Sequence, residues 1–438
     1  MRAESFWNAV QDAPMLRGRI TADVAIAGGG LSGLTCALWL SRAGLRVAVV
    51  EANELGSGSS AHCAGILTLA RGTLYSDLEK QRGCETTASC AETLKNAMRT
   101  VGETAERSRV KWRVLPACIT GKEEMLQKEA EAMQRAGISA QLSHPDSKGF
   151  STEWMIRLEG MAIIHTGEYL KYLADAAREA GARLYAHSRV NALEIQELHT
   201  SRGSIQAPYL IVSTGYPILN FPGWYFSRIQ QYDCQLIPLT GSNVPDAIYQ
   251  RADGRSALRP TVKGALMVQR GMTAGSGEVQ DDKTRTDMEW GLCRTGRVFR
   301  SLECHTADGL PFIGTYGRRT PNLFVASGYG GMGILGSMMA AQAIAARILG
   351  LPSCGYEIYS GQRSIGNLQV PLDIGGRYVK ELLLHPSAPR CPHMGCRLVR
   401  NPSTRLWECP CHGSRFDDIG HVLNAPAVRD AVLQDRRS

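Results

Sequence analysis

The chain has 438 residues, of which 44% are apolar and 21% are charged, and its formal net charge is +8 at pH 7. A chain of this length and composition suits two or three globular domains with large buried cores. Its mild positive charge is not arranged as a basic stripe interleaved with aromatic residues, so we expect no nucleic-acid partner.

The apolar segments and the cysteines indicate the compartment. Residues 1–7 contain no apolar segment of the kind that signal peptides carry. The longest apolar stretch, residues 334–349, is interrupted by Gly336, Gln342 and Arg347 and is too short to span a bilayer. Thirteen cysteines spread through a chain of this length do not resemble a secreted disulfide framework. We therefore expect a cytoplasmic protein without a membrane span.

The first predicted elements form a strand–turn–helix–strand unit. A buried strand over 23–27 leads directly into Gly28-Gly-Gly30-Leu31-Ser32-Gly33, which has the Gly-x-Gly-x-x-Gly spacing of a dinucleotide-binding turn. A helix over 35–43 and a strand over 46–50 follow, and this second strand ends at Glu51. The complete unit predicts dinucleotide binding more strongly than the glycines alone would.

Each glycine of the turn has a physical role. Gly28 makes the tight turn, Gly30 lets the backbone approach a pyrophosphate, and Gly33 lets the helix touch the strand. The helix N-terminus carries partial positive charge, which favours phosphate groups, and Glu51 can accept hydrogen bonds from a ribose. This part of the chain therefore predicts a set of dinucleotide-binding residues: Gly28, Gly30, Leu31, Ser32, Gly33 and Glu51.

Later segments favour a flavin over a nicotinamide. Residues 55–65 form a small-residue loop placed to pass under a flavin, and residues 207–215 read as a hydrophobic strand that opens into a turn at Gly215. Residues 308–314 and 323–333 follow, with a helix to Leu349. Together these segments resemble the D-amino-acid oxidase-like FAD-dependent oxidoreductases over about residues 20–350.

The resemblance implies FAD as cofactor and several further contacts. In the family, the turn at Gly330–Gly333 caps the last helix against the flavin, and its N–H groups stabilise negative charge on the reduced ring. Dimethylglycine and sarcosine dehydrogenases carry a flavin-linked histidine where this chain has His62; a histidine that lines the pocket without a covalent bond is the alternative. The implied flavin contacts are Ser59, Ser60, His62, Val190, Gly215, Gly330, Gly331, Met332 and Gly333.

The C-terminal part contains two cysteines and two histidines in paired steps. Cys391-Pro-His393 is followed after fifteen residues by Cys409-Pro-Cys-His412. Two thiolates and two imidazoles are the ligands of a Rieske [2Fe–2S] cluster, and residues 385–430 closely resemble the Rieske family. By that resemblance Cys391 and Cys409 bind the inner iron, and His393 and His412 bind the outer, solvent-facing iron. A structural zinc site is the alternative for this set of ligands.

Neighbouring residues extend the resemblance. Ser414 matches the serine that donates to a bridging sulfide, whereas Phe416 replaces the tyrosine of the high-potential respiratory members, so we expect a lower potential than theirs. Cys396 and Cys411 match a pair that is disulfide-bonded in some Rieske proteins, although such bonds are unusual in the cytosol. The segment before Cys391 is too short for the strands that precede the first ligand loop in a full Rieske domain, which predicts an abbreviated base.

The predicted fold class is α/β, with a discontinuous Rossmann-like FAD-binding domain, an α+β substrate domain and a small Rieske-type β lobe. Within an oxidoreductase unit over 1–350, the FAD-binding parts are 20–74, 159–216 and 300–350, and the substrate domain takes 75–158 and 217–299. A linker over 351–380 leads to the Rieske domain over 381–438.

The two resemblances together imply oxidation of the C–N bond of an amine or amino acid. A hydride passes to the flavin, and the cluster relays single electrons to a ferredoxin-like or other external carrier. Candidate substrate residues are Tyr225, Arg228 and Arg270, with Tyr216 as a further pocket residue; an arginine suits a carboxylate. Two alternatives stay open: an oxygen-using oxidase with a structural or regulatory cluster, and a non-enzymatic electron-transfer or redox-sensing protein. The direction of electron flow is also open.

Overall fold

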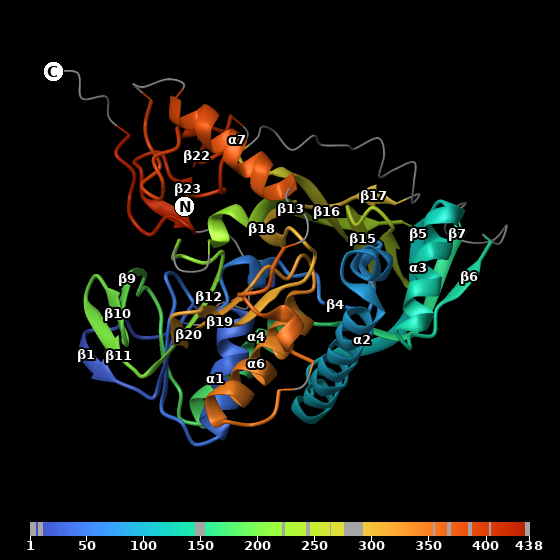
Figure 1. Ribbon diagram of the computed structural model, residues 1–438, viewed down its shortest axis with the longest axis horizontal. Helices are drawn as coiled ribbons and strands as arrows, with labels where there is room; N and C mark the ends of the chain where they lie inside the picture. Colours follow the sequence, from blue (N-terminus) through green and yellow to red (C-terminus); the bar gives the residue numbers. More distant parts are fainter. Residues whose placement is uncertain are drawn as a thin grey trace.

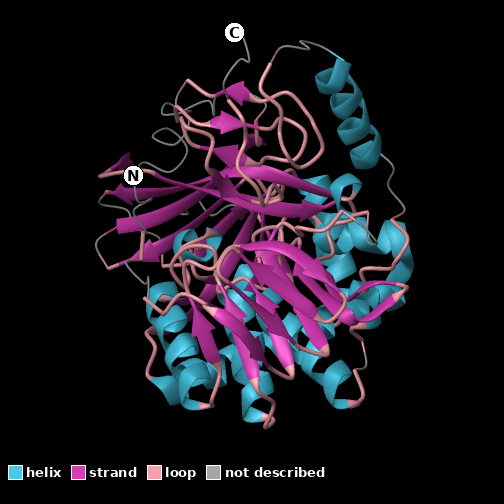
Figure 2. Cartoon of the chain, turned by 90° about the vertical axis from the view of Figure 1, so that its left-hand side faces the viewer, coloured by secondary structure: helices cyan, strands magenta, loops and turns pink. Residues whose placement is uncertain are grey.

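The computed structural model describes residues 6–7, 12–144, 154–220, 224–241, 246–262, 264–275, 292–353, 355–365, 369–383, 388–402 and 404–433. Figure 2 shows the small C-terminal strands at one end of the molecule, a large sheet in the middle and most of the helices at the opposite end. In the part of the chain that is described, no helix is long and apolar enough to cross a membrane.

A six-stranded sheet carries the dinucleotide-binding unit. Its strand order is β19-β20-β12-β2-β3-β8, and every neighbouring pair is parallel except β19 and β20. All residues of β2 and β3 are buried, as their unbroken apolar sequences require in a sheet covered on both faces. The strands are β2 (Val24–Ala27), β3 (Val47–Val50), β8 (Arg183–Tyr185), β12 (Tyr209–Gly215), β19 (Phe312–Gly317) and β20 (Thr320–Ser327).

Three helices pack beside this sheet. α1 (Leu31–Arg42) contacts both α4 (Thr166–Glu179) and α6 (Gly333–Leu349), and Figure 1 shows the three lying together next to β12, β19 and β20. A small four-stranded sheet flanks the domain in the order β1-β11-β10-β9. Its strands are β1 (Gly18–Thr21), β9 (Val190–Glu194), β10 (Glu197–Thr200) and β11 (Gly203–Gln206).

Residues 183–190 do not form one continuous strand. The chain forms β8, turns at His187, whose φ is 50°, and starts β9 at Val190. This turn moves Val190 out of the six-stranded sheet and onto the flanking one.

The substrate domain is built on a large mixed sheet with the path β17-β13-β16-β15-β14-β5-β7-β4. β18 also pairs with β13, and β6 pairs with β7. Its strands are β4 (Ile66–Leu67), β5 (Trp112–Gly121), β6 (Gln141–Ser143), β7 (Trp154–Ile164), β13 (Ile229–Thr240), β14 (Ile248–Arg251), β15 (Ser256–Thr261), β16 (Gly264–Thr273), β17 (Cys293–Arg294) and β18 (Phe299–Thr306).

Helices α2 (Leu74–Ser108) and α3 (Glu123–Arg135) pack against each other, and α3 contacts β5 and β7. α2 kinks at Gly83, which has φ 81° and ψ 170°. Short 3₁₀ turns are η1 (Ser59–His62), η2 (Tyr225–Ser227) and η3 (Glu357–Tyr359).

Two domain boundaries differ from those predicted. β7 runs through the expected boundary at residue 159, and β18 pairs with β13 although residues 300–306 were assigned to the FAD-binding part. The predicted linker over 351–380 contains most of α7 (Gln369–Leu383). Pro371 is compatible with this helix because the first turn does not need its N–H.

The C-terminal lobe is a four-stranded antiparallel sheet of very short strands: β21 (Val399–Arg400), β22 (Trp407–Glu408), β23 (Arg415–Phe416) and β24 (Val422–Asn424). In Figure 1 the lobe (red) lies against β13 and β18 of the large sheet. Arg415 joins Glu408 of the lobe to Asp233 of β13. A Cβ on Gly275 would lie 2.7 Å from Pro410 Cα, so the two backbones are in close contact there.

Candidate functional site

The dinucleotide turn connects β2 to α1. Gly28 has φ 108°, a left-handed conformation that favours glycine. A Cβ at Gly28 would lie 2.4 Å from the Ser213 carbonyl oxygen, and one at Gly33 would lie 1.8 Å from the Gly28 carbonyl oxygen. The turn therefore has room for glycine alone at these two positions, and the packing lets the helix N-terminus face the edge of the sheet where β2 and β12 end.

Side chains around the turn hold its loops in place. Glu51 accepts hydrogen bonds from the N–H groups of Gly29 at 2.8 Å and Asn53 at 3.0 Å. A carboxylate offers about four acceptor sites, so Glu51 keeps capacity for a ribose hydroxyl. Ser60 Oγ accepts from Leu31 N–H at 3.0 Å, and Ser59 Oγ donates to the Leu302 carbonyl at 2.7 Å.

One cavity of about 340 Å³ collects the predicted flavin residues. All of them line it except Gly33, which packs behind Gly28. His62 also lines the cavity, its buried Nδ1 has no hydrogen-bond partner among the described residues, and burial lowers the pKa of the ring. These features fit a flavin cleft at the carboxyl ends of parallel strands, where α/β sheets bind ligands. Whether His62 bonds covalently to the flavin stays a prediction.

Replacing Gly33 with alanine should remove FAD from the purified protein. The added Cβ would meet the Gly28 carbonyl, so the turn must open, and we expect FAD affinity to fall by roughly tenfold or more. Visible flavin absorbance per chain measures the effect. Gly376→Ala is the matched control, because a Cβ there meets nothing within 4 Å. A Gly33→Ala protein that retains full flavin would contradict this assignment.

The candidate substrate residues separate into two groups. Arg270 and Tyr216 line the cavity, but Tyr225 and Arg228 do not. The Tyr225 hydroxyl donates to the Tyr316 carbonyl at 2.9 Å, and its side chain is fully buried. Arg228 donates to the Gly361 carbonyl at 2.7 Å and stacks on Phe312. Tyr225 therefore joins η2 to β19, and Arg228 joins it to the chain after α6, so their predicted contact with substrate has no support in this geometry.

Several polar residues of the cavity were not predicted. Glu303 and His305 on β18 join at 3.2 Å between Oε2 and Nε2, and Arg270 Nη1 lies 3.4 Å from His305 Nδ1. Arg71, in the loop before α2, donates to the Gly330 carbonyl. These residues come from three separate segments without a local motif, so only tertiary structure brings them together.

Burial and mutual contacts set the charge of this cluster. Burial lowers the pKa of His305 to about 4, so the imidazole is neutral at neutral pH. Burial alone would raise the pKa of Glu303, but the hydrogen bond from His305 and the charge of Arg71 leave it lower than usual. Glu303 is therefore a carboxylate, and burial lowers the pKa of Arg71 to about 10, which leaves it protonated.

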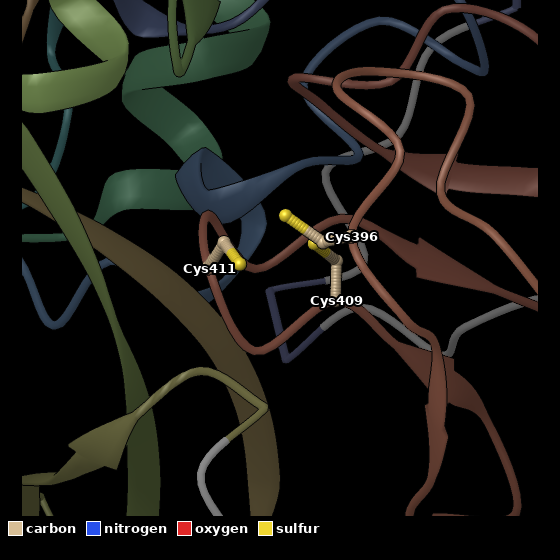
Figure 3. Close-up of side chains that lie close together, drawn as sticks. All are labelled: Cys396, Cys409 and Cys411. Atoms are coloured by element: carbon tan, nitrogen blue, oxygen red, sulfur yellow. The ribbon is translucent and has the colours of Figure 1, made fainter. Parts of the chain in front are cut away.

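The second candidate centre lies between the two ligand loops of the C-terminal lobe. Cys391 and Cys409 are each 1% exposed, and their thiols contact each other. The rings of His393 and His412 have centroids 5.0 Å apart. The sulfurs of Cys396, Cys409 and Cys411 lie within 4.8 Å of one another, and Figure 3 shows these side chains turned toward one another from the two loops.

Unpaired nitrogens show that this set of residues fits an iron–sulfur cluster. Nδ1 of His393 and both ring nitrogens of His412 are buried without a hydrogen-bond partner among the described residues. Burial also lowers the pKa of His393 to about 4 and that of His412 to about 3, so both rings are neutral, as metal binding requires. Two neutral imidazoles beside two adjacent thiols match the Rieske ligand set. The ligand roles of these residues remain predictions. Cys396 and Cys411 are free thiols in this structure, so the disulfide seen in some Rieske proteins is not formed here.

The outer iron is expected to face solvent, but His412, one of its two expected ligands, is buried in the structure. Its side chain is buried, with 1% of the residue exposed, and its ring lies 6.3 Å from that of Tyr216 and 6.4 Å from that of Phe226. His393 is half-buried and hydrogen-bonds through Nε2 to Asn220. The histidine edge of the centre therefore faces the oxidoreductase domain, because the lobe docks on β13 with its ligand loops inward.

Comparison with known proteins agrees with both centres. The family model described as DAO, FAD dependent oxidoreductase, matches residues 23–347, and the Rieske [2Fe-2S] domain model matches residues 383–434. YhfW of Bacillus subtilis (strain 168), a protein named after a Rieske 2Fe-2S iron-sulfur centre, is 24% identical, with 97% of this chain and 96% of that protein covered.

Two further proteins resemble the oxidoreductase part. Gamma-glutamylputrescine oxidoreductase of Escherichia coli (strain K12) is 28% identical over 44% of this chain and 49% of its own. The crystal structure of glycine oxidase from Geobacillus kaustophilus has the same fold, with a TM-score of 0.66 at 18% identity, covering 79% of this chain and 99% of that one. The chain therefore belongs to the FAD-dependent oxidoreductase family, and it combines that FAD enzyme with a C-terminal Rieske [2Fe-2S] domain.

Proposed function

We propose that this protein is an amine or amino acid dehydrogenase whose electrons leave through its Rieske domain to an external carrier. FAD supplies a hydride acceptor and the cluster supplies a one-electron relay. The family membership and the glycine-oxidase fold support an amine or amino acid as substrate. The carbon beside the amine loses a hydride, and water then hydrolyses the resulting imine.

The observation that carries the proposal is that the Rieske lobe forms one wall of the flavin cavity. Asn424, Ala425, Ala427 and Val428 of the lobe line the same cavity as Gly28 of the dinucleotide turn. Electron transfer through protein slows steeply with distance, so a lobe at the cavity wall supports direct exchange between the two centres. A purely structural cluster would gain nothing from this position.

Two side chains connect the cavity wall to His412. Gln231 on β13 lines the cavity, and its Nε2 donates to the carbonyls of His412 at 2.9 Å and Ala425 at 3.0 Å. Tyr216 also lines the cavity and presents its ring to that of His412. These contacts provide a short path of covalent and hydrogen bonds along which an electron can pass from the flavin cavity to His412, an expected ligand of the outer iron.

The remaining cavity groups orient the substrate. Arg270 offers a guanidinium for a carboxylate. The neutral His305 adds no positive charge beside an amine that must itself be unprotonated to lose a hydride. Glu303 keeps His305 in the tautomer that donates through Nε2, which leaves Nδ1 to accept from Arg270.

An anaerobic screen of amines and amino acids on the purified protein tests the function. A substrate should bleach the flavin and produce the EPR signal of a reduced Rieske cluster in the same sample. Bleaching without cluster reduction, together with peroxide formation in air, would instead identify an oxygen-using oxidase.

Replacing Gln231 with leucine should slow electron transfer between the centres by about tenfold, because the lost hydrogen bonds loosen the lobe at its contact with the cavity. The flavin is reduced by light, so the measurement needs no substrate, and the cluster is followed by rapid-freeze EPR. Gln230→Leu is the control, since this neighbour accepts a hydrogen bond from Arg377 of α7 and does not line the cavity. Equal rates in the wild type and Gln231→Leu would exclude this route.

A further inference from the structure

Five arginines line the cavity; Arg189 adjoins Val190, one of the predicted flavin contacts, and the other four belong to separate segments of the substrate domain and the loop before α2. These four come from the loop before α2, the end of β14, the turn between β14 and β15, and β16. The four residues are Arg71, Arg251, Arg255 and Arg270, and all of them line the cavity.

The backbone brings these arginines to one turn. A Cβ on Gly72, next to Arg71, would lie 2.9 Å from the Ala252 carbonyl oxygen, so the loop before α2 touches the β14–β15 turn. Arg270 Nη2 donates to the Asp253 carbonyl in the same turn at 3.4 Å. Four guanidinium groups therefore surround a single pocket wall.

Their charge exceeds that of the acidic groups facing them. Glu303 lines the cavity near Arg270 and His305, and Asp253, which does not line it, lies 3.8 Å from Arg251. His305 is neutral because burial lowers its pKa. Arg189 and Glu51 also line the cavity and cancel each other in charge, so the four positive groups face two negative ones and two positive charges are in excess.

The arginines differ in how firmly they are held. Arg71 donates to the carbonyls of Gly330 and Tyr329, so its position is fixed by the protein. Arg270 stacks on Tyr232 at 5.3 Å, and both of its hydrogen bonds are long, at 3.4 Å. Arg255 is exposed, and its guanidinium has no hydrogen bond or ion pair with any described residue.

We propose that the substrate carries two carboxylate groups in addition to its amine, with Arg270 binding the inner carboxylate and Arg255 the outer one. This inference rests on the proposed function and narrows its substrate class to amino dicarboxylates and their N-alkyl derivatives. With its amine unprotonated, as hydride loss requires, such a molecule carries a charge of −2, which balances the excess of the pocket.

Binding of unreactive acids tests the proposal independently of turnover. Holoprotein is titrated at constant ionic strength with succinate and glutarate, and with propionate and butyrate, while the flavin difference spectrum reports occupancy. We expect the dicarboxylates to bind about tenfold tighter, since each charge-assisted contact adds affinity. Equal dissociation constants for the two kinds of acid would overturn the proposal.

Variants separate the two carboxylate sites. Arg255→Gln should weaken succinate about tenfold and leave propionate unchanged, whereas Arg270→Gln should weaken both. The matched control is Arg319→Gln, an exposed arginine that does not line the cavity. If Arg255→Gln weakens the binding of succinate and propionate equally, or weakens neither, then Arg255 does not bind the outer carboxylate.

The anaerobic reaction with amines then tests the dicarboxylate preference separately from the proposed dehydrogenase function. We expect N-methylglutamate, glutamate or aspartate to bleach the flavin faster than sarcosine, proline or putrescine does. Rapid bleaching by the monocarboxylates with no preference for dicarboxylates would refute the inference and leave the dehydrogenase function intact. Selective dicarboxylate binding without bleaching by any amine would refute the function and leave the binding site intact.

Discussion

A His412→Ala protein should be purified with FAD but without an iron–sulfur cluster. His412 is buried, both of its ring nitrogens lack partners among the described residues, and it faces His393 across 5.0 Å. Removing one imidazole leaves the outer iron with a single protein ligand, and a Rieske centre needs two. Iron and sulfide content and the EPR signal of the reduced protein measure the loss.

The flavin side should survive this change, because the dinucleotide turn is made by residues 28–33 of another domain. His421→Ala serves as the matched control: it lies in the same lobe, but its side chain is 61% exposed and faces Asp417. We expect His421→Ala to keep both cofactors. An iron–sulfur cluster that persists at full occupancy in His412→Ala would show that this histidine is not a ligand.

An Arg415→Met protein should lose stability by about 3–5 kcal/mol, because it leaves two buried carboxylates without a counter-charge. Arg415 donates to Glu408 at 2.9 Å and contacts Asp233 across the domain interface, and the three side chains are 9%, 2% and 5% exposed. Urea unfolding, followed through cluster absorbance and flavin fluorescence separately, measures the effect on each domain. The cluster signal should be lost first, since the triad anchors the lobe.

The triple variant Asp233→Asn, Glu408→Gln, Arg415→Met tests the cause. Removing all three charges relieves the repulsion, so most of the lost stability should return. Arg429→Met provides the control, since Arg429 is an exposed arginine of the same lobe. If the triple variant is as unstable as Arg415→Met, packing of the arginine stem rather than its charge accounts for the loss.

The sequence predicts those parts of the site whose residues lie close together in the chain as a motif. The run from Gly28 to Gly33 and the paired steps at 391–393 and 409–412 carry their chemistry in local spacing, and the structure collects each set at one place. Tyr225 and Arg228 are predicted from residue type and from their place in the expected substrate domain, and their hydrogen bonds instead join backbone carbonyls far along the chain.

The features of the site that the sequence does not predict depend on how separate elements pack together. Arg71, Arg255 and Glu303 come from a loop, a turn and a strand that are far apart in the chain, and no motif relates them. The inward direction of His412 follows from docking of the lobe on β13, which depends on the buried contact between Arg415 and Asp233. The linker over 351–380 is predicted from its proline and glycines, and the sequence does not show that most of α7 lies within it, with Leu372 and Val379 largely exposed.

The shared wall of the cavity dictates an order of assembly. Leu423, Asn424, Ala425, Ala427 and Val428 close one side of the flavin cleft, and they follow all of the FAD-binding segments in the chain. During translation the N-terminal domain folds first, so the cleft stays open on that side until the ribosome has released the lobe. The organic cofactor therefore has its widest entrance before the lobe docks, and docking of the lobe encloses it.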